Sequence, residues 1–349
     1  MNKALSIVFA LATLAAQGQT TERHLKNVKQ LTFGGNNAEA YFSFDGKKLS
    51  FQSDYAVWGN QCDQIFMYNL KKPLTDSIAK PQLISTGTGR TTCSFFMPGN
   101  KQILYASTYK AGTDCPAPPA PRADRKYVWA IYNSFDIFVA DLKGNVVKQL
   151  TDVPGYDAEA TVSPKGDKIV FTSMRSGDPE LYTMNIDGSD VKQITSGLGY
   201  DGGAFFSPDG TQLVFRASRP KTEEEIKEYK ELLAQGLVMP TEMEIYVCNV
   251  DGSNLRQVTT LGKANWAPFF THDGKKIVFS SNHHSTKGYD FQLYMINVDG
   301  TGLEQITTES IFNAFPMFSP DGKKLVFSSN RNNKPGSRDT NLFIADWVD

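Results

Sequence analysis

One hairpin-forming stretch occurs six times in this chain, and this repetition limits the possible folds more than any other feature. The copies are YFSFDGKKLSFQS, FFMPGNKQILYAS, TVSPKGDKIVFTS, FFSPDGTQLVFRA, FFTHDGKKIVFSS and MFSPDGKKLVFSS, beginning at Tyr41, Phe95, Thr161, Phe205, Phe269 and Met317. Each has an apolar segment, a turn rich in Pro, Asp and Gly, and a second apolar segment, which together predict two antiparallel strands. Six copies predict a repeat architecture whose units bury their faces against one another.

Two further short segments complete each repeat. A third strand is predicted from Gln64, Asp136, Glu180, Glu244, Gln292 and Asn341, and a fourth from PQLIS, KQLTD, KQITS, RQVTT and EQITT. The sixth copy of the fourth strand, KQLTF at Lys29, precedes the first hairpin. The sequence therefore predicts an all-β, six-bladed β-propeller of four-stranded antiparallel blades. The N-terminal strand is expected to close the last blade by pairing with NLFIAD, because an unpaired edge would otherwise remain.

The SPDGKK-type hairpin, the (E/Q)(L/I)Y-x-x-N-x-DG strand and the x-Q-(I/L/V)-T strand resemble the repeats of the TolB-like propeller family. Propellers of this kind also occur attached to prolyl-oligopeptidase-type hydrolases. The resemblance implies a propeller over nearly all of the chain, and it implies no particular activity because one fold hosts many functions. In TolB proper an α/β domain precedes the propeller, whereas here the repeats follow the N-terminal segment almost directly.

Residues 1–18 have the form of a secretory signal peptide. Lys3 is followed by an apolar run from Ala4 to Ala16 and then by small residues, and this run is too short for an ordinary membrane span. We expect cleavage after Gly18, leaving residues 19–349 as a single propeller; a retained membrane anchor is the alternative. No other stretch approaches the roughly 20 apolar residues of a spanning helix. The sequence thus predicts a periplasmic or secreted protein, and we expect a monomer.

Charge and cysteine content narrow the partners further. The chain has 36 basic and 37 acidic residues and a net charge of -1, so it has no field to attract nucleic acid. Export permits disulfides among its four cysteines. Cys248 lies in the apolar run EIYVCNV and is expected in the core. Cys115 is then able to pair with either Cys62 or Cys93.

Two long insertions, at about residues 109–135 and 219–243, interrupt blades 2 and 4 between the second and third strands. Antiparallel strands alternate in direction, so both insertions share one face of the ring with the connections between blades, and the DG turns occupy the opposite face. We call the face that carries the two insertions the long-loop face. Binding sites are more often built on such long individual loops than on the scaffold beneath them, so we expect the ligand there.

Each insertion has its own local signals. Thr222 and Glu225 have capping-box spacing and predict the start of a helix, which would lie on the rim or dock a partner. The prolines from Pro116 to Pro121 predict an extended, polyproline-like segment. The aromatic residues beside it, Tyr127, Trp129 and Tyr132, would form a ligand platform or pack inward.

Three aligned positions at the long-loop face supply candidate site residues. Four positions before each hairpin lie Asn37, Thr91, Asp157, Asp201, Asn265 and Asn313, and two positions later lie Glu39, Cys93, Glu159, Gly203, Ala267 and Phe315. After each second strand lie Tyr55, Tyr109, Arg175, Arg219, His283 and Arg331. From these we predict a ligand-binding set of Asn37, Glu39, Asp157, Glu159, Asp201, Asn265, Asn313, Arg175, Arg219, His283 and Arg331.

Two interpretations of these residues remain open. In one, the Asp and Asn side chains bond nearby backbone and each arginine pairs with a carboxylate. In the other, four carboxylates (Glu39, Asp157, Glu159 and Asp201) converge on the mouth of the central channel. Asp157, Glu159 and Asp201 then predict a cation site, for which oxygen-only donors favour Ca²⁺ over zinc.

Catalytic motifs are scarce. The chain has no G-x-S-x-G sequence, which argues against a serine peptidase, and His283 and His284 are the only clustered histidines. We therefore predict a non-catalytic propeller that binds an envelope or extracellular protein, peptide or glycan on the long-loop face. The alternative is a hydrolase or lyase that acts on a polysaccharide or peptide with the carboxylates of the same funnel.

Overall fold

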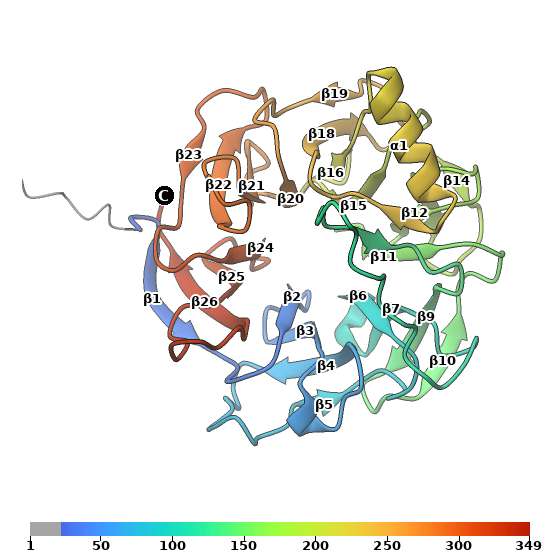
Figure 1. Cartoon of the computed structure of the whole chain (residues 1–349). Coiled ribbons are helices and arrows are strands. Elements are labelled where there is room, and N and C mark those ends of the chain that lie inside the picture. The colour runs from blue at the N-terminus through green and yellow to red at the C-terminus, as the bar shows by residue number, and fades with distance from the viewer. Residues whose placement is uncertain (1–21) are drawn as a thin grey trace, which may run out of the picture.

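The computed structural model describes residues 22–349, which form a closed ring of six four-stranded antiparallel sheets (Figure 1). The predicted fold class is thereby confirmed. The predicted signal peptide lies outside the described residues. No helix within the described part of the chain is both long and apolar enough to cross a membrane.

For each blade, the strands are given in order from the axis outward. Blade 1 has β2 (Asn37–Phe42), β3 (Lys48–Ser53), β4 (Gln64–Asn69) and β5 (Gln82–Leu83). Blade 2 has β6 (Thr91–Phe96), β7 (Gln102–Ser107), β9 (Asp136–Asp141) and β10 (Val146–Gln149). Blade 3 has β11 (Asp157–Val162), β12 (Lys168–Ser173), β13 (Glu180–Asn185) and β14 (Lys192–Gln193).

Blades 4 to 6 follow the same order. Blade 4 has β15 (Asp201–Phe206), β16 (Gln212–Ala217), β18 (Glu244–Asn249) and β19 (Arg256–Gln257). Blade 5 has β20 (Asn265–Phe270), β21 (Lys276–Ser281), β22 (Gln292–Asn297) and β23 (Glu304–Gln305). Blade 6 has β24 (Asn313–Phe318), β25 (Lys324–Ser329), β26 (Asn341–Trp347) and β1 (Leu25–Gln30).

The remaining elements lie in the connections. The insertions of blades 2 and 4 contain β8 (Trp129–Ala130), α1 (Glu223–Leu233) and β17 (Leu237–Val238), and two 3₁₀ turns span Ala56–Trp58 and Pro98–Asn100. The helix begins as predicted, because Thr222 and Glu225 form a complete capping box. One long connection departs from the expected division of faces: residues 70–81 link β4 to β5 on the face otherwise built of short turns.

The repeated aromatic residue of the second strand forms the core between blades. It is completely buried in all six copies, at Phe51, Tyr105, Phe171, Phe215, Phe279 and Phe327. Full burial of such a side chain contributes roughly 1.5–3 kcal/mol relative to exposure, so the repeat itself supplies the interlocking surface. The hairpin therefore recurs because each blade needs the same buried aromatic side chain to pack against its neighbour.

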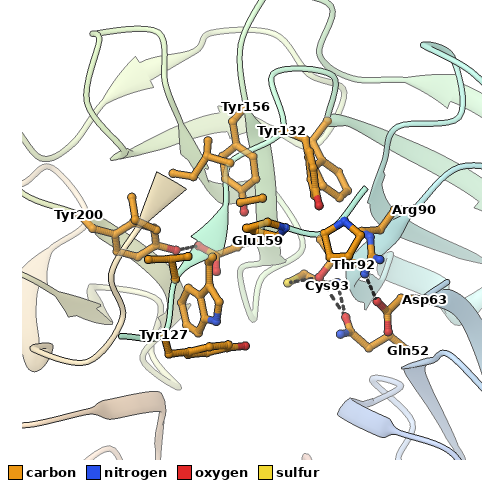
Figure 2. A pocket seen from close by; sticks show the side chains of 18 of the residues that line it. Gln52, Asp63, Arg90, Thr92, Cys93, Tyr127, Tyr132, Tyr156, Glu159 and Tyr200 are labelled. Carbon is orange, nitrogen blue, oxygen red and sulfur yellow. Dashed lines mark hydrogen bonds and ion pairs between the residues drawn. The ribbon is translucent and has the colours of Figure 1, made fainter. Parts of the chain in front are cut away.

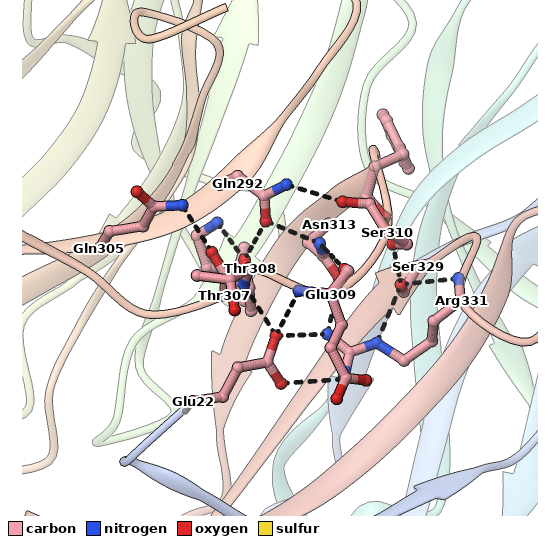
Figure 3. Close-up of polar contacts among 12 residues, drawn as sticks. Glu22, Gln292, Gln305, Thr307, Thr308, Glu309, Ser310, Asn313, Ser329 and Arg331 are labelled. Carbon is pink, nitrogen blue, oxygen red and sulfur yellow. Dashed lines mark hydrogen bonds and ion pairs between the residues drawn. The ribbon is translucent and has the colours of Figure 1, made fainter. Parts of the chain in front are cut away.

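The ring closes as the displaced repeat predicts. The strand β1 pairs antiparallel with β26, with Lys29 opposite Ile344, and the two lie side by side in Figure 1. The residues just before β1 also tie blade 6 to blade 5 (Figure 3). Glu22 forms a two-point ion pair with Arg331 at 3.1 Å and accepts backbone hydrogen bonds from Thr308 and Glu309. The first strand is thus held by both charge and ladder pairing.

Aromatic side chains fill the axis of the ring. Tyr41 of blade 1 contacts Phe205 of the opposite blade 4, with ring centroids 5.6 Å apart, and Phe95 and Phe269 pack against this pair. Because side chains from opposite blades touch, the channel is closed at this level. A ligand entering from the long-loop face would therefore reach a closed base.

Candidate functional site

Each innermost strand carries a β-bulge that turns one side chain out of the sheet pattern. The register shifts between Ala38 and Tyr41 in blade 1, and at the matching place in the other five blades. The bulge residue adopts a left-handed conformation in every blade: Glu39, Cys93, Glu159, Gly203, Ala267 and Phe315 have φ between 46° and 61°. L-residues pay roughly 1–2 kcal/mol for this conformation, and bulges commonly re-aim side chains at functional sites.

Three of these bulge residues, Glu39, Cys93 and Glu159, line a cavity of about 710 Å³ on the long-loop face (Figure 2). Its floor includes Glu39, Cys93, Glu159 and Arg216, from blades 1 to 4. Aromatic side chains stand around the floor, namely Tyr127, Trp129, Tyr132, Phe135, Tyr156 and Tyr200. The proline-rich segment of the blade 2 insertion, residues 118–121, lines the same cavity. The predicted face and the predicted insertion thus meet at one site.

Glu159 is the most heavily bonded acid of the floor. Only 8% exposed, it accepts hydrogen bonds from Thr172 at 2.8 Å, Tyr200 at 2.5 Å and the Gly203 amide at 2.9 Å. It also forms an ion pair with Arg216, whose guanidinium donates to the Tyr200 hydroxyl at 3.1 Å. Burial disfavours the charged arginine, but Glu159 and its neighbours more than offset this and hold the pKa of Arg216 above its usual value.

The sequence prediction did not include Arg216. In the other copies the same strand position is Gln52, Ala106, Thr172, Ser280 or Ser328. The Arg216 side chain fits because Gly202 and Gly203 are opposite: a Cβ on Gly203 would collide with its guanidinium, and one on Gly202 with Glu159. A signal was present in the sequence, because this copy reads FRA where others read FTS or FSS, and because Gly202 and Gly203 stand next to each other in the segment that forms β15.

Glu39 is the floor acid with a free oxygen. Its Oε2 accepts hydrogen bonds from Tyr41 at 3.0 Å and from the Cys93 thiol at 3.0 Å, while Oε1 accepts none within residues 22–349. Burial raises the pKa of Glu39, and the hydrogen bond from Cys93 and the charge of Arg216 partly oppose this. Burial also raises the pKa of the Cys93 thiol well above its usual value, so it acts as a neutral donor.

The basic residues of the cavity are largely paired. Arg90 contacts Asp63 at 2.6 Å on one wall. At the rim, Glu228 of α1 forms ion pairs with both Arg122 and Lys126, each with a nitrogen–oxygen distance of 3.0 Å. The cavity therefore offers hydrogen-bonding groups with little uncompensated charge.

Three attachments hold the insertion of blade 2 over the cavity. Cys115 forms a disulfide with Cys62 of blade 1, which decides between the two predicted pairings and leaves Cys93 and Cys248 free. The strand β8 pairs with β17, so the insertions of blades 2 and 4 join into one structure, which we call the roof (residues 115–132 and 222–238). The third attachment is the charge cluster around Glu228.

Aromatic residues of the roof line the cavity, and two of them, Trp129 and Tyr132, also pack against buried residues, so features of both interpretations are present. Trp129 lies over the Arg216 guanidinium at 5.1 Å and contacts Trp266 at 5.3 Å. Tyr132 donates a hydrogen bond to the Ala117 carbonyl at 2.8 Å and so braces the proline-rich segment. Tyr127 is 58% exposed at the cavity edge. In α1, Tyr229 and Leu232 are buried, consistent with packing on the rim.

Of the eleven predicted ligand-binding residues, the structure places two in this cavity, Glu39 and Glu159. The predicted residues that stand four positions before a hairpin lie instead inside the junctions between blades. They are at most 1% exposed, namely Asn37, Asp157, Asp201, Asn265 and Asn313. The asparagines donate to backbone carbonyls of the preceding blade, for example Asn265 to Met243 at 2.9 Å. This arrangement agrees with the interpretation in which the Asp and Asn side chains bond nearby backbone or pair with an arginine.

The outer basic residues complete the same junctions. Arg175 pairs with Asp157 at 2.7 Å, Arg219 with Asp201 at 2.6 Å, and Arg331 donates to Asn313 at 2.9 Å. Each arginine also lies over an aromatic ring of its own blade, at 4.9–5.3 Å from the nearest centroid. Arg219 lines a separate cavity of about 390 Å³ beneath α1. His283 bonds to Ser281 at 3.0 Å and packs on Tyr294.

The predicted calcium ligands are not gathered into one site. Within residues 22–349, no group of three or more His, Cys, Asp or Glu side chains is arranged to hold a metal ion. Asp157, Glu159 and Asp201 each form an ion pair with a different arginine, so each carboxylate already has a counter-ion of its own. The residues present therefore do not fit the predicted cation site.

Solved structures with the same fold are numerous, and their sequences are distant. A protein from Agrobacterium tumefaciens assigned as TolB is 19% identical, with a TM-score of 0.57, covering 90% of this chain and 91% of that one. TolB from Acinetobacter baumannii is 18% identical, with a TM-score of 0.54, covering 90% and 64%. An oligogalacturonate lyase in complex with manganese is 14% identical, with a TM-score of 0.52, covering 92% and 93%.

A family model gives the assignment that these distant structures cannot. The model of the TolB beta propeller domain matches residues 126–235 and 229–341, which together span more than half of the chain. The matched region runs from the blade 2 insertion to the last strand. This chain belongs to the TolB β-propeller family.

Proposed function

We propose that this protein is a non-catalytic binding propeller of the periplasm or the extracellular space, acting as a monomer. It takes part of an envelope or extracellular protein, peptide or glycan into the cavity of the long-loop face. The observation that carries this proposal is the cavity of about 710 Å³ above a closed axis, roofed by the two insertions that distinguish blades 2 and 4. Such concave sites with a few convergent polar groups are the usual binding sites of proteins.

The bonding of the floor supports binding over catalysis. Glu159 is held by four donors, so its oxygens are committed to the fold. A general base must reach a substrate proton, and a carboxylate that is satisfied in this way is poorly placed to do so. The export proposal is supported by the signal-like N-terminus and by the Cys62–Cys115 disulfide, because such bonds persist in oxidising compartments.

Capture from native material tests this function. Wild-type protein and the double variant Glu39→Gln/Tyr132→Ala would be immobilised and exposed to envelope extract and culture supernatant. The control is Glu231→Gln/Tyr289→Ala, which makes the same changes at exposed positions outside the cavity. We expect a species retained by the wild type and the control and lost from the cavity variant. Identical retention by all three would contradict the proposal.

A hydrolase or lyase is the second candidate. Two observations favour it: the fold likeness to an oligogalacturonate lyase, and a floor carboxyl, Glu39, whose pKa burial raises. A carboxyl with a raised pKa keeps its proton to higher pH than an ordinary glutamate, which is what a general acid requires. Incubation with oligogalacturonate and with neutral polysaccharides, followed by product analysis, tests it. Turnover that Glu39→Gln abolishes would establish this candidate and remove the non-catalytic one.

A further inference from the structure

We infer that the cavity takes one end of a neutral oligosaccharide, whose hydroxyl groups meet Glu39, Arg90 and Arg216 while its rings rest on the aromatic wall. This inference rests on the proposed function and names its ligand class. Four features of the cavity support it: the charge balance, the unmet hydrogen-bonding groups, the composition of the walls and the closed base.

The charge balance favours an uncharged ligand. Most acids and bases that line the cavity form ion pairs with one another or with Glu228 at its rim; Glu39 instead accepts hydrogen bonds from Tyr41 and Cys93. Among the lining bases, Arg125 is exposed and forms no ion pair with any of the residues that the structure describes. Away from Arg125, an anionic ligand would need to break one of these pairs to gain a counter-ion, whereas a neutral polar ligand adds bonds without this cost.

Residues of the cavity lining contain both donors and acceptors that have no hydrogen-bond partner among the described residues. The Nε atoms of Arg216 and Arg90 are buried without an acceptor among residues 22–349, and Oε1 of Glu39 has no donor there. Unpaired buried donors are uncommon in folded proteins and call for water or a ligand. A sugar hydroxyl supplies one donor and two acceptor sites, so adjacent hydroxyls satisfy an arginine and a carboxyl together.

The walls are aromatic and contain few branched aliphatic side chains. Tyr127, Trp129 and Tyr132 come from the roof, and Tyr156 stands across the cavity in Figure 2. Aromatic faces carry a negative potential that attracts the C–H groups on the flat face of a pyranose ring. Val128, Ile131 and Val238 are the branched aliphatic residues of the lining. A peptide anchored by apolar side chains would need a larger aliphatic pocket.

The closed base determines how a polymer enters. Tyr41 and Phe205 meet across the axis, and the space around the bulge residues directly above them is about 20 Å³, enough for little more than one water molecule. A chain molecule therefore cannot thread through the ring. Its end occupies the cavity, and the remainder leaves past the roof.

Titration with defined oligosaccharides tests the ligand class. Maltohexaose, cellohexaose and chitohexaose would be added while tryptophan fluorescence is recorded, because Trp129 lies in the cavity wall. We expect saturable binding of at least one of them. Tyr127→Ala should weaken that binding by about tenfold or more, as expected for loss of one stacking face. The matched control is Tyr289→Ala, since Tyr289 is 57% exposed and lies outside the cavity.

A second arm separates this inference from the proposed function. Envelope extract and culture supernatant would be oxidised with periodate or digested with protease before capture on wild-type protein and on Tyr127→Ala. Retention that periodate abolishes and protease spares, and that Tyr127→Ala loses, supports a glycan. Failure of the three oligosaccharides together with protease-sensitive retention overturns the inference and leaves the binding function standing. Equal retention by wild type and Tyr127→Ala overturns the inference, whereas the binding function is overturned only by equal retention in the Glu39→Gln/Tyr132→Ala experiment.

Discussion

Arg216 of blade 4 and Glu159 of blade 3 form a buried ion pair beneath Trp129 of the roof. The pair links two blades and the blade 2 insertion at the floor of the cavity. Arg216 reaches this place because two glycines leave room for it. The geometry of the floor therefore depends on a single charged side chain that the other blades lack.

Removal of one partner should destabilise the protein strongly. In Arg216→Met, Glu159 loses its counter-ion while it stays buried, and a broken buried pair typically costs about 3–5 kcal/mol. We expect a lower free energy of unfolding in urea, with part of the loss recovered in Arg216→Met/Glu159→Gln. Lys227→Met, which breaks the exposed pair with Glu231, should leave the urea midpoint unchanged. An unchanged midpoint in Arg216→Met would show that the pair contributes nothing.

A side chain at Gly203 should lower the free energy of unfolding. Its φ is 61°, and an added Cβ would meet the guanidinium of Arg216. We expect Gly203→Ala to lose roughly 1–3 kcal/mol more than Gly177→Ala, because overpacking adds to the backbone strain that the two share. Gly177 has a φ of 91° and open space around it, so it isolates the strain. Equal losses in thermal or urea unfolding would mean that Arg216 moves aside without penalty.

The disulfide should hold the roof more than it holds the ring. In Cys62→Ser/Cys115→Ser, one of the three attachments of the blade 2 insertion is lost. We expect faster hydrogen–deuterium exchange in residues 109–135 under native conditions, with unchanged exchange in β7 and β12. The chain-entropy model gives an upper value of about 4 kcal/mol for the effect on unfolding. Uniform exchange changes around the ring would contradict a local role.

The junction between blades 3 and 4 should make stability depend on pH. Glu180 faces Asp201 there, whereas the next two junctions have Glu244 with Asn265 and Gln292 with Asn313. Burial, and next to it the charge of Asp201, raises the pKa of Glu180 to about 8, although a hydrogen bond from Thr195 opposes this. The folded protein thus holds this proton more tightly than the unfolded chain. Its stabilisation is full below the ordinary glutamate pKa and is lost as the pH rises through about 8.

Urea unfolding at pH 6 and pH 9 measures this dependence. We expect the wild type to lose roughly 1–2 kcal/mol over this interval. Glu180→Gln should flatten the profile, because an amide cannot ionise and can donate to Asp201 as the asparagines do elsewhere. Glu244→Gln is the matched control at the next junction and should leave the slope as in the wild type. Equal slopes in wild type and Glu180→Gln would refute the assignment.

Sequence reasoning predicted the face and the insertion that border the candidate cavity, but it did not predict correctly which individual side chains line that cavity. It named Glu39 and Glu159, which do line the cavity, but it grouped them with Asp157 and Asp201, which lie in the junctions. The two kinds of position are only two residues apart in the strand. A β-bulge between them sends one side chain into the cavity and the other into the blade interface, and no residue type in the repeat marks that bulge.

The sequence by itself determined the six blades, the closure by β1 and the capped helix, because each follows from local patterns repeated in register. The tertiary structure alone decided that Cys115 meets Cys62, that β8 joins β17, and that Arg216 reaches Glu159. These contacts join residues far apart in the chain, and they depend on how neighbouring blades are placed around the axis. The repeated local patterns define the blades. The candidate site forms between blades, from residues that are close in space but far apart in the sequence.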